Sequence, residues 1–125
     1  MKFFGSERRN KERVEVAWQA ELLWQFPDKK GFLPVRVSNV SMQGALVLSK
    51  TMMAGNRHLF VSDEKPDLRL RLVLPGDHEL TPRVKIARFQ KVEETPLFHL
   101  AVNFDGLTPE ETGFLRDFFR TIQNL

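Results

Sequence analysis

The chain has 125 residues, of which 42% are hydrophobic, and a formal net charge of +3. This length suits one compact domain with its own core, and nothing in the composition suggests a second domain. The absence of cysteine excludes a disulfide framework and a thiolate metal site. No apolar run approaches the ~18 residues of a membrane-spanning helix, and the N-terminus lacks a signal-peptide core, so we expect a cytoplasmic protein without membrane insertion.

The positive charge is concentrated at the N-terminus. Residues 1–13 carry five basic side chains against two acidic ones and account for the whole net charge, while the rest of the chain is balanced. Three of the basic residues are arginines, Arg8, Arg9 and Arg13. Arginine presents a planar fork of donors that matches phosphate oxygens and the O6/N7 edge of guanine. We therefore predict a flexible basic arm over 1–13 that binds an anion, followed by a single domain over 14–125.

The segment after this arm alternates apolar and polar side chains. From Val14 to Phe26 every even position is apolar, which predicts a long strand, bent or bulged, with one buried face. Related patterns separated by turn residues predict five further strands, within 32–38, 45–48, 67–74, 84–92 and 97–104. We interpret 50–65 as a long connection with room for a short strand.

A helix is predicted at the C-terminus. Thr108, Pro109, Glu110 and Glu111 form a capping box with proline at the first helical position, and the apolar residues that follow recur at helical spacing. These features predict an amphipathic helix over 109–123. The fold class is therefore predicted to be mainly β, a small six-stranded antiparallel barrel with a C-terminal α-helix.

Patterns typical of catalysis and metal binding are not found in the sequence. The three histidines are scattered without ligand spacing. The adjacent glutamate pairs fall in a predicted turn and in the first turn of the predicted helix, where structural roles suffice. A phosphate-binding glycine loop is also missing. We therefore predict a non-catalytic protein with no metal and no cofactor.

Two short motifs carry a family resemblance. Arg9 to Arg13 has the form R-x-x-x-R directly before the first predicted strand, and Asn39 to Gly44, with Ser41, has the form N-x-S-x-x-G. In this order and β context they resemble the signature of the PilZ family. The resemblance extends to the last predicted strand and to the opening of the helix. One departure is Ala101, where members often carry glycine; we expect it to lie away from both motifs and to affect only local packing.

The resemblance implies a PilZ-type barrel that is a bacterial receptor for the second messenger c-di-GMP. Arg9 and Arg13 would contact phosphate and the Hoogsteen edge of guanine. Asn39 and Ser41 would donate and accept hydrogen bonds to the ligand, and Gly44 would let the ligand approach the backbone. The arginine arm would close over the ligand and alter a surface recognised by an unidentified downstream protein, with the chain itself a monomer.

Arg8 bears on the number of ligands. An arginine directly before R-x-x-x-R resembles the members that hold an intercalated pair of c-di-GMP molecules, because its flat guanidinium can stack on a base. Two other functions stay open: a PilZ-like adaptor that works by protein contact without ligand, and a barrel that binds single-stranded nucleic acid. The balanced charge outside the arm and the aromatic residues at buried positions favour c-di-GMP over nucleic acid.

Overall fold

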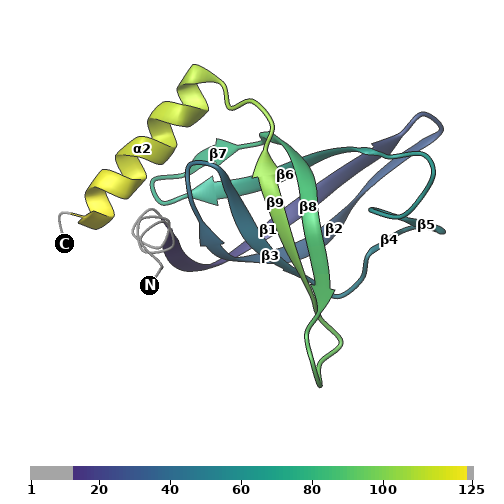
Figure 1. Cartoon of the computed structure of the whole chain (residues 1–125). Helices are drawn as coiled ribbons and strands as arrows, with labels where there is room; N and C mark the ends of the chain where they lie inside the picture. Colours follow the sequence, from purple (N-terminus) through teal and green to yellow (C-terminus); the bar gives the residue numbers. More distant parts are fainter. Residues whose placement is uncertain (1–12, 124–125) are drawn as a thin grey trace, which may run out of the picture.

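The computed structural model describes residues 13–123 (Figure 1). This part of the chain is mainly β: six antiparallel strands form a closed barrel, one extra strand extends it, and a helix follows at the C-terminal end. The barrel order is β1-β2-β3-β9-β8-β6, and pairing of β6 with β1 closes the ring. The predicted fold class is thus confirmed. The predicted arm over 1–13, with Arg8 and Arg9, lies outside the described residues except for Arg13.

The bounds of the elements follow the predicted pattern. The barrel strands are β1 (Val14–Phe26), β2 (Lys29–Val40), β3 (Gly44–Ser49), β6 (Asp67–Leu74), β8 (Arg83–Lys91) and β9 (Phe98–Phe104). Outside the ring, β7 (His78–Leu80) pairs with β6, and β4 (Met53–Ala54) pairs with β5 (Arg57–His58) in a separate ribbon. The helix, labelled α2, spans Pro109–Gln123, the range predicted from its capping box.

The hairpin between β1 and β2 is tighter than the sequence indicates. The turn is limited to Pro27 and Asp28, and β2 already begins at Lys29, although the predicted strand lies within 32–38. Gly31 lies opposite Trp24, and a Cβ on Gly31 would lie 2.6 Å from the indole ring. The ladder continues to the turn because the glycine leaves space for this buried tryptophan.

The core lies inside the barrel, on the even positions of β1 and β6. Leu22 and Leu70 are paired across β1 and β6 and are both fully buried. The alternation that predicted these strands therefore also identified the buried face. Trp18 is half-buried near the barrel end, where its ring packs edge-on against Phe118 of α2 at a centroid distance of 5.3 Å. The helix covers this end of the barrel (Figure 1).

The capping box also anchors α2 to the barrel. The Thr108 hydroxyl accepts a hydrogen bond from the Glu111 N–H at 3.1 Å, and the Glu111 carboxylate accepts one from the Thr108 N–H at 3.0 Å. The second carboxylate oxygen of Glu111 accepts from the Thr81 N–H at 3.2 Å, between β7 and β8. One side chain thus caps the helix and joins it to the corner of the sheet. Within 13–123, no helix has the length and apolar character needed to span a membrane.

The ladders are interrupted by three register shifts near one another. They lie between Glu15 and Trp18 in β1, between Val37 and Asn39 in β2, and between Ile86 and Arg88 in β8. A bulge adds a residue to one strand, which changes the direction of the side chains beyond it. The bulge in β2 directly precedes Asn39, and the bulge in β8 directly precedes Arg88.

Candidate ligand-binding site

A cavity of about 390 Å³ lies on the outside of the barrel, where β2 turns into β3. It contains all the predicted site residues that the structure describes, Arg13, Asn39, Ser41 and Gly44. Within residues 13–123 the lining consists of Arg13, Asn39, Ser41, Gln43, Gly44, Ala45, Leu46, Ala87, Arg88, Ala101, Val102 and Asn103. The two remaining predicted residues, Arg8 and Arg9, lie outside the described part of the chain.

The β1–β2 hairpin brings the two motifs together. Val14 is paired with Val40 and Glu15 with Asn39, so β2 ends beside the residue that precedes β1. Arg13 occupies that position and is exposed. An antiparallel hairpin returns the chain to its starting point, which explains why motifs separated by a whole strand pair share one cavity.

Ser41 forms hydrogen bonds within the turn that links β2 and β3, with both its side chain and its backbone. Its Oγ accepts from the Gln43 N–H at 3.1 Å and from the Gly44 N–H at 3.3 Å, and its own N–H donates to the Gly44 carbonyl at 2.8 Å. Serine hydroxyls stabilise turns in this manner. The serine is also buried. Its first role is therefore to shape the turn on which the cavity is built.

Gly44 is required by the barrel itself. A Cβ at this position would lie 2.0 Å from the Val102 carbonyl oxygen and 3.0 Å from the Asn103 Cα, both in β9. Any other residue would have to push β9 away from β3. We expected this glycine to make room for a ligand; the structure gives a reason that lies in strand packing.

Asn39 differs from Ser41 and Gly44 in facing the cavity with uncommitted groups. It follows the bulge of β2, is half-buried, and forms no side-chain hydrogen bond with another residue in 13–123. A carboxamide offers both donors and an acceptor. Of the three defining residues of the motif, Asn39 is thus the one whose side-chain donors and acceptor are not used by other residues in 13–123.

Arg88 lines the same cavity and was not identified from the sequence. Before the bulge of β8, Ile86 lies at an inward position of the strand, and after the bulge Phe89 does. The two residues between them, Ala87 and Arg88, are therefore both exposed on the outer face. Arg88 is paired with Ala101 of β9. The sequence signal for the bulge is that apolar and polar residues cease to alternate between Ile86 and Phe89. Our prediction of one regular strand within 84–92 did not take this break into account.

Ala101 corrects another expectation. We expected it to lie away from both motifs, but it lines the cavity between Leu46 of β3 and Arg88 of β8. Its methyl group therefore occupies part of the surface that a ligand would contact. The departure from the family pattern at this position affects the shape of the site as well as strand packing.

The lining indicates which chemistry the cavity suits. It has two guanidinium groups, from Arg13 and Arg88, and three carboxamides, from Asn39, Gln43 and Asn103, but no acidic side chain among the lining residues. Guanidinium groups favour anions, and carboxamides suit the polar edges of a base. The volume falls in the range of small-ligand sites. Within the described residues, no group of His, Asp and Glu side chains could hold a metal ion.

No family model matches the chain, and the search of curated proteins found no match either. The function must therefore be argued from the motifs and the cavity. The feature with the most weight is the convergence of Arg13, Asn39 and Arg88, which come from three separate segments, on one concave surface.

Proposed function

We propose that this chain is a non-catalytic PilZ-type receptor for c-di-GMP, which it binds in the cavity between Arg13, Asn39 and Arg88. The observation that supports the proposal is that the last arginine of R-x-x-x-R and the three defining residues of N-x-S-x-x-G, Asn39, Ser41 and Gly44, line one cavity to which residues 13–123 contribute no acidic side chain. The ligand carries two phosphates and two guanines, so it needs cations together with donors and acceptors at base edges.

Each residue has a role that follows from its position. Arg13, directly before β1, and Arg88 of β8 are separated in the strand order by β2, β3 and β9, and both bind phosphate or the O6/N7 edge of guanine. Asn39 forms hydrogen bonds with a guanine edge. Ser41 and Gly44 act through the turn and the β3–β9 contact, which hold Asn39 and Gln43 in place.

The N-terminal arginines complete the site in this proposal. Arg8 and Arg9 precede Arg13 in the sequence and are close enough along the chain to reach the same ligand. With Arg8 stacked on a base, the chain holds two intercalated c-di-GMP molecules. Closure of this arm over the ligand changes the surface available to a downstream protein, which converts binding into a signal.

Calorimetric titration with c-di-GMP tests the site. Arg13→Ala and Arg88→Ala should each weaken binding roughly ten- to a hundred-fold, because a charge-assisted contact contributes about 1.5 to 3 kcal/mol. The matched control is Arg83→Ala, which removes an exposed arginine of β8 that does not line the cavity. Its affinity should equal that of the wild type. In the same titrations Arg8→Leu should halve the number of ligands bound per chain.

Several outcomes would reject the proposal. Folded wild-type protein that does not bind c-di-GMP would leave the adaptor function, which needs no ligand. Binding that excess single-stranded RNA displaces would favour the nucleic-acid alternative. An equal loss of affinity in Arg83→Ala and Arg88→Ala would mean that the ligand responds to overall charge and not to this cavity.

A further inference from the structure

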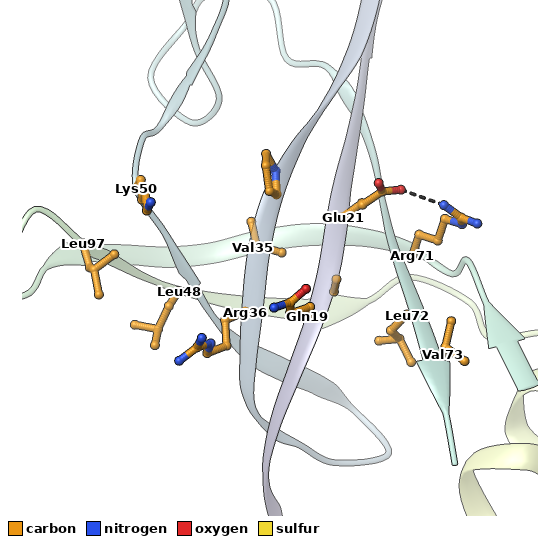
Figure 2. Close-up of a pocket in the computed structure, with 12 residues that line it drawn as sticks. Gln19, Glu21, Val35, Arg36, Leu48, Lys50, Arg71, Leu72, Val73 and Leu97 are labelled. Atoms are coloured by element: carbon orange, nitrogen blue, oxygen red, sulfur yellow. Dashed lines mark hydrogen bonds and ion pairs between the residues drawn. The ribbon is translucent and has the colours of Figure 1, made fainter. Parts of the chain in front are cut away.

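A second and larger concave surface lies elsewhere on the barrel. This groove, of about 690 Å³, crosses the outer face of β6, β1, β2 and β3 and shares no lining residue with the cavity at Asn39 (Figure 2). We call it the Arg36 groove. It plays no part in the proposed c-di-GMP site, so its occupant is a separate question.

The groove forms where two barrel strands diverge. The β1–β6 ladder ends at the pair Glu21 and Arg71. Beyond this pair, β1 continues beside β2, with Gln19 opposite Arg36, while β6 continues beside β7. The outer surface is therefore hollowed between the end of the ladder and the part of β1 that has left β6.

The walls of the groove are largely apolar and open to solvent. Leu48 of β3 is the cross-strand partner of Arg36, and Figure 2 shows Leu97 next to Leu48. Both leucines are half-buried, and Val73 of β6 is 47% exposed. Pro34 of β2 adds a further exposed apolar side chain. Apolar walls with a few convergent polar groups are typical of small-molecule sites, and this volume is within their usual range.

The charges in the groove are unequally distributed. On the β6 side, Arg71 contacts Glu21 at 2.8 Å and Glu79 at 3.1 Å, so two carboxylates surround one cation. On the opposite side, Arg36 and Lys50 form no ion pair with another residue in 13–123. Figure 2 shows these two cations on the side of the leucines, across the groove from the Arg71–Glu21 pair. An anionic group is thus attracted to one side only.

We propose that the Arg36 groove binds amphipathic carboxylates, small molecules with one anionic head group and an aliphatic or aromatic body. The carboxylate binds the guanidinium of Arg36 with support from Lys50, and the body covers Leu48 and Leu97 and extends toward Val73. A single negative charge matches the site, because a more highly charged ligand would also approach the Glu21 carboxylate across the groove.

Decanoate is a suitable probe, used below the concentration at which it forms micelles. In heteronuclear NMR titration, the amide signals of Gln19, Arg36 and Leu48 should shift with decanoate. Decanol, which has the same chain without the charge, should bind at least roughly tenfold more weakly. Arg36→Glu should weaken decanoate binding roughly tenfold or more, and Lys50→Glu, directly after β3, should act in the same direction.

The control for these variants is Arg83→Glu, which makes the same change of charge on an exposed strand position outside the groove. It should leave decanoate affinity unchanged. Equal binding of decanol and decanoate, shifts confined to other parts of the barrel, or no loss in either Arg36→Glu or Lys50→Glu would overturn the proposal. Arg36→Glu should keep the affinity for c-di-GMP, so failure of one site is distinguishable from failure of the other.

Discussion

The cavity at Asn39 and the Arg36 groove share β2 and β3 but are built from different kinds of backbone. The cavity lies where bulges and a tight turn interrupt the ladders, and it gathers arginine and carboxamide groups. The groove lies where β6 diverges from β1, beside regular stretches of the β1–β2 and β2–β3 ladders, and its character comes from apolar side chains on the outer face and from an ion pair. Irregular backbone thus concentrates polar groups at one place, whereas apolar residues at outward positions of regular strands, such as Leu48 and Val73, leave an apolar surface exposed at the other.

The largest expected effect tests the rigid base of the cavity. Gly44→Ala should destabilise the fold by about 3 kcal/mol, because the new methyl group would lie within 2.0 Å of the Val102 carbonyl oxygen. Chemical denaturation would measure the change in the free energy of unfolding. The matched control is Gly113→Ala in α2, where a Cβ meets nothing within 4 Å.

Gly113→Ala should stabilise the protein by about 0.5 to 1 kcal/mol, since alanine is the better helix former. If both variants had similar stability, the close approach of β9 to β3 would not be a constraint. Gly44 would then have to be explained by the ligand, as the sequence suggested.

A smaller effect separates the two roles of the motif serine. Ser41→Ala removes the acceptor of the Gln43 and Gly44 N–H groups and should lower the free energy of unfolding by about 1 to 2 kcal/mol without any ligand present. Thr121→Ala, which removes an exposed hydroxyl bonded to the Asp117 carbonyl in α2, should change stability by less than about 0.5 kcal/mol. Unchanged stability in Ser41→Ala, with weaker c-di-GMP binding, would show that the serine serves the ligand alone.

The smallest effect concerns the electrostatics of the groove. The hydrogen bond and charge of Arg71 lower the pKa of Glu79 below its ordinary value. Arg71→Met should therefore raise the pKa of Glu79 toward that of an unperturbed glutamate, as measured by NMR titration of the carboxyl group. Lys85→Met removes a cation of β8 that lies near Asp105, and it should leave the pKa of Glu79 unchanged.

The sign of the pH dependence follows from this lowered pKa. A carboxylate with a depressed pKa in the folded state favours folding above the pKa it has when unfolded, and this contribution is lost as the pH falls through the folded-state value. Any stability that Arg71 confers through Glu79 should thus disappear on acidification. The contribution is small because both side chains are exposed and screened by solvent. A stability difference that persists in acid would mean that Arg71 acts by packing.

Much of the fold could be predicted because its signals are local. The even positions of β1, from Ala20 to Phe26, are buried as their alternation indicated. The capping box at Thr108 predicted the start of α2, since the hydrogen bonds that cap a helix form within one turn. The predicted strands at 14–26 and 32–38 correctly indicated a hairpin, but β2 begins three residues earlier than predicted. The sequence did not show this because the fit of Gly31 to Trp24 is a contact between strands.

The site could be predicted only in part. Two spaced motifs indicated Arg13 and Asn39, and the structure brings both to one cavity. Arg88 and Ala101 were missed as members of the lining, because their positions depend on a bulge in β8 and on the order β3-β9-β8. Strand order joins residues distant in the chain, and a bulge reverses the faces of all later side chains in its strand.

By itself, the sequence determined the class of fold, the buried face of the long strands, the terminal helix and the two motifs, since each depends on neighbours along the chain. Only the tertiary structure decided that Ser41 and Gly44 first serve the turn and the contact with β9, and that Arg88 joins Arg13. It also decided that Arg36 and Leu48 lie in one groove. These outcomes depend on pairing between strands, and the distances across a sheet are set by the whole barrel.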